Sequence, residues 1–421
     1  MNIQIPFVSK SALNTHFVGA CVAALLICTL HSTAFGATFT WNQPDGTFGW
    51  NVDGNWTTAG FPNANADIAD LGQLDITSPT TVNLNQAITV GQLLIGDTNN
   101  TLGATYTIAP NGGSLTFNNT GGSGNAKLTQ TAGGRGATIS ANVTLGSDLD
   151  VSNMSTTAHQ LTLSGTTNLN GQAMNLNVAF GNNTNTGINV GALTGSGAVV
   201  KNGNGYAKMT AANANTYSVT INDGTLSYAS VSMAGAGDIT VNSGGVLDYS
   251  SGGNATYGNI ISGAGSVTKG LTGTLTLTGS NTYTGNTTVT TGTLVLADDS
   301  QTKFVIGASG VNNKITGVAN LTLDGDFVFD LSGAGINLGD SWNIVDVGTL
   351  SETFGSTFSV LGFTDNLDNT WTKINAGTTY RFSETTGVLT VVPEPSTWAL
   401  LAVSGMTLLF LRQRRKTCYS A

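Results

Sequence analysis

Few residues between the two ends of the chain could support acid–base or nucleophilic chemistry. His159 is the one histidine of the long middle region, and the three cysteines, Cys21, Cys28 and Cys418, all lie near the ends. A Ser-His-Asp site would have to use His159, yet the chain has no Gly-x-Ser-x-Gly elbow, phosphate-binding loop, dinucleotide fingerprint or His-Glu-x-x-His motif. We therefore expect His159 to be a solvated surface residue before a strand, and we expect no catalytic residue and no enzymatic activity.

Paired carboxylates are the second candidate chemistry. Asp148 and Asp150 lie at positions i and i+2, as do Asp324 and Asp326, so each pair would share one face of a strand. Carboxylates grouped on a β-sheet surface can bind calcium or take part in polysaccharide cleavage. Neither pair lies in an EF-hand loop or a glycine-rich calcium repeat, so we expect turn and surface roles, with no metal site and no cofactor. Weak calcium binding by either pair stays open.

Composition excludes some partners and indicates the fold class. Between Thr38 and Glu394 lie all 23 acidic residues and only nine basic ones, so this region carries a net charge of −14. Such a surface repels phosphates, which argues against a nucleic-acid partner. The region has no cysteine and therefore no disulfide. Val, Leu and Ile alternate with Thr, Asn and Gly in short runs, which favours strands and turns and predicts an all-β protein.

Residues 1–36 have the features of a secretory signal peptide. Lys10 supplies a positive charge, Val18 to Leu30 form an apolar run, and the small residues Ala34 and Gly36 follow. The run is shorter than the roughly 20 residues of a comfortable membrane span. We expect cleavage near Gly36 and export of the body; an uncleaved N-terminal anchor is the alternative.

A second apolar stretch occurs near the other end of the sequence. Residues 398–411 are uncharged, and a helix of that length spans roughly 21 Å of a hydrocarbon core that is about 30 Å thick. Four basic residues follow it: Arg412, Arg414, Arg415 and Lys416. By the positive-inside rule this basic tail stays in the cytoplasm while the body lies outside. The sequence thus predicts one transmembrane helix over 397–411.

A proline-bracketed motif, Val392-Pro393-Glu394-Pro395-Ser396, comes just before this stretch. Each proline fixes its own φ and biases the residue before it toward extended backbone. Glu394 is therefore expected in an extended segment, which is the conformation that a processing enzyme can bind. The simpler alternative is that the prolines only end the last strand and start the helix.

The motif, the short apolar helix and the Arg-rich tail, over residues 391–416, together resemble the PEP-CTERM sorting signal of Gram-negative bacteria. The resemblance implies processing by a membrane enzyme of the exosortase type. It also implies a single-pass intermediate in the bacterial membrane, with the body outside, and then delivery to the cell surface or the extracellular space.

Two stretches of the middle region repeat one pattern. Residues 195–230 and 263–297 both contain Gly-x-Gly, then Val, then a lysine at the same distance from the first glycine. These lysines are Lys201 and Lys269. Asn-Thr-Tyr and Gly-Thr-Leu follow in both copies. An internal repeat of this length indicates stacked structural units.

Glycines recur at the expected turns, at Gly224, Gly245, Gly273 and Gly292. We interpret each interval between neighbours in this series as the length of one coil of a β-solenoid. In each coil, alternate residues such as Leu275 and Leu277 would face the core while threonines face solvent. Stacking buries one continuous apolar column, which predicts a parallel β-helix with Asp298 and Asp299 at a corner. An antiparallel sandwich is the alternative.

The repeats resemble the autotransporter-associated β-strand repeat of bacterial surface proteins, most clearly over residues 190–299. Weaker echoes reach back to Thr89, so the solenoid is expected over 89–314. The first copy has Ser218 after Tyr217 and lacks the glycine of the Asn-Thr-Tyr-x-Gly element, which puts its turn in doubt. The implied fold is again a parallel β-helix.

The regions on either side of the repeats differ in composition. Residues 37–88 hold three of the six tryptophans, Trp41, Trp50 and Trp56. We expect these rings to cap the open end of the solenoid, since large aromatics bury much area; stacking on sugar rings is the alternative. Residues 315–390 have strand-like runs and are expected to form a closing β module.

Two functional hypotheses follow. The first is an exported, non-enzymatic structural protein of the cell surface or extracellular matrix, which the PEP-CTERM resemblance associates with exopolysaccharide and biofilm. The second is a carbohydrate-binding protein or carbohydrate-active enzyme on the same solenoid. An exposed row of tryptophans, or a groove with clustered acids and bases, would favour the second.

Overall fold

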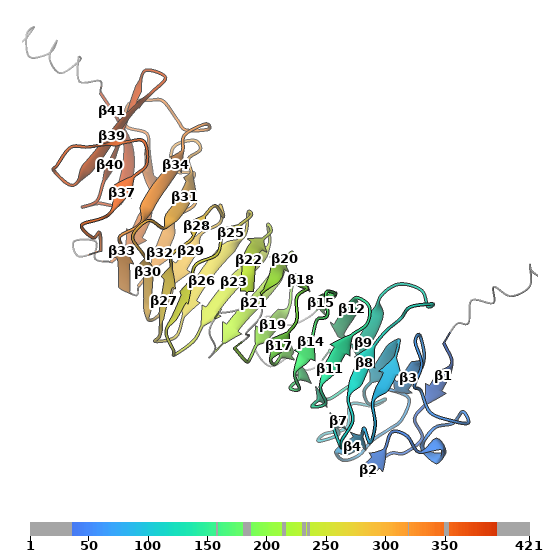
Figure 1. Cartoon of the computed structure of the whole chain (residues 1–421). Helices are drawn as coiled ribbons and strands as arrows, with labels where there is room; N and C mark the ends of the chain where they lie inside the picture. The colour runs from blue at the N-terminus through green and yellow to red at the C-terminus, as the bar shows by residue number, and fades with distance from the viewer. Residues whose placement is uncertain are drawn as a thin grey trace, which may run out of the picture.

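The computed structural model describes residues 36–156, 159–179, 187–212, 216–229, 233, 236–318, 320–348 and 353–393. These residues form a long rod of short β-strands, with β1 at one end and β41 at the other (Figure 1). Apart from one 3-10 turn, η1 (Asp53–Asn55), the regular structure in this part of the chain is β-strand. The predicted signal peptide and the predicted transmembrane helix lie outside the described residues.

Each coil of the rod has two or three strands, which pair with the strands of the next coil. β12 (Leu149–Asn153) pairs in parallel with β15 (Ala173–Val178), and Leu149 lies beside Met174 of the next coil. In a shorter coil, Val199 lies beside Val219 in the same way. Parallel pairing between successive segments of the chain is the stepwise winding of a β-solenoid, so an antiparallel sandwich is excluded for this region.

Within the described residues the parallel strands form five sheets. The first sheet contains β1 (Thr38–Thr40), β3 (Ile68–Leu71), β6 (Gln92–Ile95), β9 (Ala126–Gln130), β12, β15, β18 (Ala198–Asn202), β20 (Tyr217–Ile221), β22 (Ala236–Val241) and β25 (Ile261–Ser262). The second sheet contains β2 (Gly46–Gly49), β4 (Thr80–Asn83), β7 (Tyr106–Ala109), β10 (Ala137–Ile139), β13 (Leu161–Leu163), β16 (Ile188–Val190), β19 (Tyr206–Met209), β21 (Gly224–Ala229), β23 (Gly245–Ser250), β26 (Ser266–Gly270), β29 (Thr287–Val289), β32 (Ile315–Gly317) and β36 (Val345–Val347).

Three smaller parallel sheets complete the coils. The third sheet contains β5 (Ile88–Val90), β8 (Leu115–Phe117), β11 (Val143–Leu145), β14 (Thr167–Asn168) and β17 (Leu193–Thr194). The fourth contains β24 (Ala255–Tyr257), β27 (Thr274–Leu277), β30 (Thr293–Leu296) and β33 (Asn320–Leu323). The fifth contains β28 (Ser280–Asn281), β31 (Gln301–Val305), β34 (Asp326–Asp330) and β37 (Ser359–Val360).

The last sheet is antiparallel, and we call it the terminal sheet. Its strands lie in the order β35 (Ser341–Asn343), β41 (Val388–Val392), β40 (Thr378–Ser383), β39 (Thr370–Asn375) and β38 (Thr364–Asp365). It occupies the C-terminal end of the rod (Figure 1).

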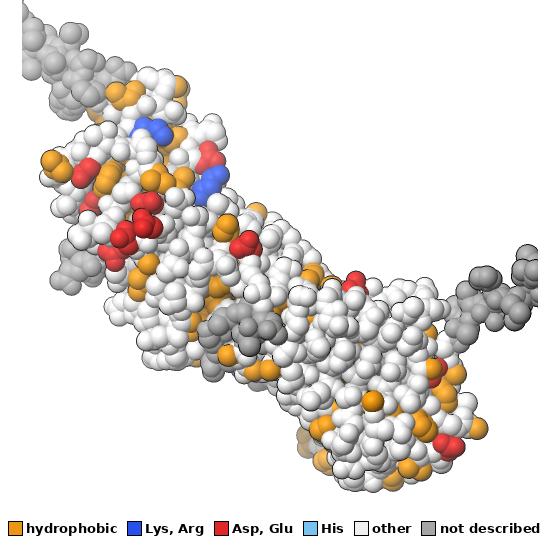
Figure 2. Space-filling view, viewed as in Figure 1, with side chains coloured by type: hydrophobic (Ala, Val, Ile, Leu, Met, Phe, Trp, Pro, Cys, Tyr) orange, Lys and Arg blue, Asp and Glu red, His pale blue; other side chains and the backbone are white. Residues whose placement is uncertain are grey.

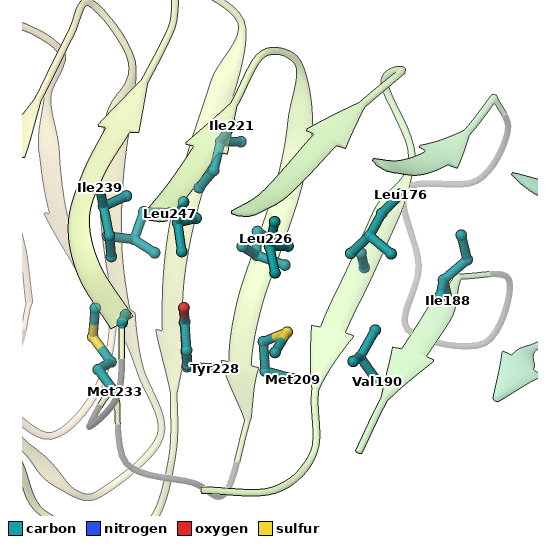
Figure 3. Close-up of a cluster of buried hydrophobic side chains, with 14 of the residues drawn as sticks. Leu176, Ile188, Val190, Met209, Ile221, Leu226, Tyr228, Met233, Ile239 and Leu247 are labelled. Atoms are coloured by element: carbon teal, nitrogen blue, oxygen red, sulfur yellow. The ribbon is translucent and has the colours of Figure 1, made fainter. Parts of the chain in front are cut away.

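The core is a column of apolar side chains that runs inside the rod. Val190, Met209 and Tyr228 occupy one register position in three successive coils and are fully buried (Figure 3). In β27, Leu275 and Leu277 are buried and the alternating Thr274 and Thr276 are half-buried, which confirms the expected alternation. Each coil covers the apolar face of its neighbour, and burial of a Leu or Val side chain contributes about 1.5–3 kcal/mol.

A ladder of asparagines joins successive coils at the ends of their strands. Asn202 Nδ2 donates to Asn177 Oδ1 at 3.1 Å, Asn222 Nδ2 donates to Asn202 Oδ1 at 2.8 Å, and Asn242 Nδ2 donates to Asn222 Oδ1 at 2.7 Å. An amide both donates and accepts, so one residue type can continue such a row indefinitely. The ladder helps to keep neighbouring coils in register.

The two copies of the sequence repeat lie on different sides of the rod. The strand that carries Lys201 is β18 of the first sheet, whereas the strand that carries Lys269 is β26 of the second sheet. Gly224 lies beside Gly245, so the interval between these two glycines is one coil. Gly273 precedes β27 in the fourth sheet. The interval from Gly245 to Gly273 therefore joins two different sheets, and its interpretation as a coil length is wrong.

Lys201 is fully buried and ties the corner of its own coil to the next one. Its ammonium group donates to the carbonyl oxygens of Asn202 at 2.9 Å and Gly203 at 2.6 Å. A third hydrogen bond, 3.1 Å long, reaches the carbonyl oxygen of Asp223 in the following coil. Three acceptors satisfy all three donors of a lysine ammonium group.

Lys269 repeats this arrangement on the other side of the rod. It is fully buried, and its ammonium group donates to the carbonyl oxygens of Gly270, Leu271 and Thr291 at 2.5, 2.7 and 3.2 Å. Gly292, at φ +79°, follows Thr291, and a Cβ there would lie 2.3 Å from the Leu271 oxygen. The glycine of the Gly-Thr-Leu element is thus needed because the corner backbone passes too close for a side chain. We call each such lysine with its three carbonyls a corner clamp.

Parallel pairing extends beyond both ends of the range expected from the repeats, 89–314. β1 pairs with β3 and β2 pairs with β4, so the tryptophan-rich segment forms the first coils. At the other end β34 pairs in parallel with β37, up to Val360. Within the described part of the chain, no helix has the length and apolarity that a membrane crossing needs.

Replacing a clamp lysine should destabilise the protein. In Lys269→Met the apolar stem is kept but three buried carbonyl oxygens lose a charged donor, so we expect the free energy of unfolding to fall by about 2 kcal/mol. Lys127→Met is the matched control, since Lys127 lies exposed on β9 and its replacement should change stability by less than about 0.5 kcal/mol. Chemical denaturation followed by circular dichroism measures both; equal losses would contradict the clamp.

The burial of Lys201 also predicts a dependence of stability on alkaline pH. Burial lowers the pKa of Lys201 to about 8 from its ordinary 10.5, while the charge of Asp223 acts in the opposite direction. Between these values the unfolded chain binds the proton and the folded chain does not, so stability should rise with pH from about 8 toward 10. Lys201→Met should show a smaller rise in denaturation midpoint over this range. Identical pH profiles for the two proteins would refute the assignment.

Candidate functional site

The predicted sorting motif begins at the end of the last strand. Val392 closes β41, where it lies beside Thr379 of β40, and Pro393 follows directly. β41 is hydrogen-bonded on both sides, to β40 and to β35. Proline has no main-chain N–H and cannot extend the ladder, so the chain leaves the sheet at Pro393. This agrees with the simpler interpretation of Pro393 as the end of a strand and also suits a motif that must be accessible.

The rest of the predicted signal lies outside the described residues. This applies to Glu394, Pro395 and Ser396 of the motif and to the basic tail, Arg412, Arg414, Arg415 and Lys416. Their roles stay predictions from the sequence.

An aromatic cluster fixes the terminal sheet to the last coil. Phe327 of β34 lies with its ring centroid 5.0 Å from that of Phe358 and 5.8 Å from that of Phe382, which belongs to β40. All three rings are buried. Edge-to-face and tilted ring pairs at these distances stabilise by about 0.5–1.5 kcal/mol beyond the area that they bury. The sheet that carries the motif is therefore packed on the end of the solenoid.

The strand beside β41 adds a second attachment. Trp342 of β35 is fully buried, and its indole N–H donates to the carbonyl oxygen of Ala308 at 2.8 Å. Tyr380 of β40 donates through its hydroxyl to the carbonyl oxygen of Gly335 at 3.0 Å. Both contacts join the terminal sheet to loops of the last coils, so β41 is held between strands that are themselves fixed.

A hollow of about 770 Å³ adjoins the end of β41. Val392 and Pro393 line it together with Lys373, Arg381 and Asp368. Arg381 forms an exposed ion pair with Asp368 at 3.6 Å, and the Lys373 ammonium lies 5.6 Å from the centre of the Phe363 ring. In Figure 2 the blue Lys and Arg side chains in view gather at this C-terminal end of the rod.

His159 lies at a shallow surface hollow and is half-buried. Burial lowers the pKa of the imidazole, and the charge of Arg135 acts in the same direction. The hollow of about 450 Å³ is lined by His159, Thr, Gly, Ala and Gln residues. This lining supplies neither a serine nor a carboxylate, so the described residues around His159 do not form a Ser-His-Asp arrangement.

The first carboxylate pair has structural partners. Asp148 Oδ1 accepts from the main-chain N–H of Ala173 at 2.8 Å. Asp150 Oδ1 accepts from the side-chain amides of Asn125 at 3.0 Å and Asn175 at 2.8 Å. These bonds join three successive coils, with Asp148 just before β12 and Asp150 within it, so both half-buried carboxylates have structural partners.

The second pair is divided between a turn and a strand. Asp324 lies in the turn before β34, and Asp326 begins β34 and accepts a hydrogen bond from the Ser359 hydroxyl. Among the described residues no group of three His, Cys, Asp or Glu side chains is placed to hold a metal ion. Asp298 and Asp299 lie in a turn, with Asp299 at φ +63°, which confirms the expected corner.

The N-terminal tryptophans are buried in the first coils. Trp41 and Trp50 are fully buried and Trp56 nearly so, and Trp56 contacts both of the others edge-to-face at 4.9 and 5.0 Å. The Trp50 indole N–H donates to the carbonyl oxygen of Pro62 at 2.9 Å. Stacking on a sugar needs an exposed ring face, so the arrangement fits a hydrophobic cap and disagrees with a sugar-binding row.

Sequence reasoning missed three buried carboxylates, Asp67, Asp97 and Asp248. Of these, Asp248 lies in β23. Its oxygens accept from the hydroxyls of Ser227 at 2.6 Å and Ser250 at 2.9 Å. Burial raises the pKa of the Asp248 carboxyl, while the two hydroxyls and the charge of Lys269 oppose the shift. The signal that could have found it is an acid inside the otherwise apolar run Val246 to Tyr249.

Comparison with models of protein families finds a match to the PEP-CTERM protein-sorting motif at residues 391–416. The match covers the segment in which the sequence placed the sorting signal. Neither curated proteins nor solved structures give a match.

Removing an inner ring of the N-terminal cluster should destabilise the first coils. We expect Trp50→Ala to lower the free energy of unfolding by about 3–5 kcal/mol, because it leaves a cavity among the other rings. Trp50→Phe, which keeps most of the volume and loses only the indole N–H, should cost less. Thermal unfolding followed by near-ultraviolet circular dichroism compares the two. If Trp50→Ala unfolds like the wild type and instead loses affinity for a polysaccharide, the cap interpretation is wrong.

Proposed function

We propose that this chain is an exported structural protein of the cell surface or extracellular matrix, processed at its PEP motif by an exosortase-type membrane enzyme. The PEP-CTERM motif at residues 391–416 is the observation that carries the proposal, because it is a sorting signal of exported proteins. In this proposal the chain is first a single-pass membrane intermediate with its body outside, and is then delivered as a released or surface-bound rod.

The position of the motif supports processing. Val392 and Pro393 lie at the end of a strand that is paired on both sides, so the segment that follows starts from a fixed point. A processing enzyme that binds extended backbone would meet the motif at one position relative to the folded body. The body would stay folded while the peptide bond is exchanged or cut.

The solenoid supports a structural role. Its coils bury a continuous apolar column and present rows of Thr and Asn on the outside, which suits a stiff, hydrated spacer or scaffold. The resemblance of its repeats to autotransporter-associated repeats fits passenger domains of surface proteins. An association with exopolysaccharide and biofilm belongs to this proposal and has its support in the PEP-CTERM resemblance. We propose that the body acts without catalysis.

Processing can be tested by intact mass spectrometry of the mature protein from cells that contain the processing enzyme. We expect the wild-type C-terminus to lie before Trp398, and we expect Glu394→Ala to keep the apolar segment and remain in the membrane fraction. Deletion of residues 412–416 should have the same effect. Asp75→Ala, an exposed acid far from the motif, is the matched control and should be processed normally.

Two results would contradict the proposal. A wild-type mature protein that still contains Trp398 would exclude processing at the motif. Turnover of an acidic polysaccharide by the purified protein, lost in Asp324→Asn or Asp326→Asn, would replace the structural role by the enzymatic one.

A further inference from the structure

Several large apolar side chains of the terminal sheet and its connections project into solvent, and three of them lie near the end of β41. Ile336 is 70% exposed, Leu338 69% and Ile374 64%. Leu367, which is 90% exposed, lies at the other end of β39, in the turn that follows β38. Exposing groups of this size is unfavourable, and a single one needs no explanation, whereas several at one end of a molecule indicate a contact.

Strand register places these side chains at one end of the terminal sheet. Ile374 lies beside Thr379, and Thr379 lies beside Val392, so the tip of the β39–β40 hairpin reaches the level at which β41 ends. The loop that carries Ile336 and Leu338 meets the same level from the other side of β41. Its Gly339 N–H donates to the carbonyl oxygen of Val391 at 3.1 Å. The apolar residues therefore flank the point at which the chain leaves the sheet.

Charges of both signs lie near this point, and Lys373 is the cation that an anionic surface would attract. Lys373 and Arg381 line the hollow beside Val392 and Pro393. Arg381 is paired with Asp368, whereas Lys373 lies over the Phe363 ring and, among the described residues, forms no ion pair with an acid. On the other flank Asp340 uses one carboxylate oxygen to accept from the Asn337 N–H at 2.9 Å within its own loop.

The length of chain beyond Pro393 limits how far this end can lie from the membrane. Only residues 394–397 separate Pro393 from Trp398, the first residue of the uncharged stretch. A chain spans at most about 3.6 Å per residue, so the five steps cover no more than roughly 18 Å whatever their conformation. That is comparable to the thickness of the headgroup region and the first water layers.

We propose that Ile336, Leu338 and Ile374 contact the outer surface of the lipid bilayer in the unprocessed protein, with Lys373 at the level of the anionic headgroups. The proposal rests on the proposed single-pass intermediate and adds the orientation of the body on the membrane. Isolated apolar residues on a loop and near a hairpin tip, with Lys373 beside one of them, match an interfacial contact better than a protein interface, whose core is a continuous packed patch.

The contact can be tested on the full chain in vesicles of phosphatidylethanolamine and phosphatidylglycerol. Single cysteines are placed by Ile374→Cys or Ile336→Cys in a chain with Cys21→Ser, Cys28→Ser and Cys418→Ser, and are labelled with a polarity-sensitive dye. Leu102→Cys is the control, because Leu102 is 83% exposed and lies near the other end of the rod. We expect a blue shift, and quenching by lipids brominated near the glycerol, at positions 374 and 336 and neither at 102.

The outcomes separate this proposal from the function on which it rests. If the chain floats with the vesicles and the dyes at 374 and 336 behave like the dye at 102, the membrane contact is wrong while the anchor stands. If the chain does not float, both the single-pass intermediate and the contact are overturned. If the dye at 374 is shielded only when the processing enzyme is added, the surface binds that enzyme and the lipid contact is excluded.

Discussion

No coil of this protein can bury its own apolar face, and the rest of the structure follows from that constraint. A short strand exposes its Leu and Val side chains unless another strand lies above and below it. Parallel stacking at one fixed register solves this for every inner coil, because equivalent residues such as Val190, Met209 and Tyr228 then superpose. Two kinds of polar contact hold neighbouring coils in this register: the ladder of asparagines on the outside and the lysine corner clamps.

At each end of the rod the last coil has a neighbouring coil on one side only. Aromatic rings cover the apolar face that would otherwise be exposed there. At the N-terminal end three tryptophans pack edge-to-face inside the first coils. At the C-terminal end a phenylalanine cluster attaches the antiparallel terminal sheet to the last parallel coil. The change from parallel to antiparallel pairing ends the stacking of coils, and the chain leaves the rod from this sheet. The sorting motif begins at that exit.

Much of this fold could be predicted from the sequence, because alternation and turn glycines report local geometry directly. Leu275 and Leu277 face the core as the pattern indicates, and Asp298 and Asp299 turn a corner. The sheet to which each turn glycine belongs could not be predicted, because the sequence around a glycine does not show which corner of the coil it occupies. For this reason the interval from Gly245 to Gly273 was wrongly interpreted as one coil.

The corner clamps could not be predicted from the sequence, for another reason. A lysine in a strand normally indicates a solvent-exposed position. Lys201 and Lys269 are buried instead, because each ammonium group has three carbonyl oxygens around it, and these contacts are visible only in the structure. At the motif, the sequence indicated the segment, while the support of β41 on both sides depends on distant strands.

The double pairing of β41 has a mechanical consequence. If the chain is pulled at Pro393 along the direction of β41 while the rod is held, the force enters the molecule along the axis of that strand. Its hydrogen bonds to β40 and β35 would then bear the load together, in shear, whereas an edge strand would be held by bonds to one neighbour only. Such an attachment resists tension until the hydrogen bonds on both sides of β41 break together.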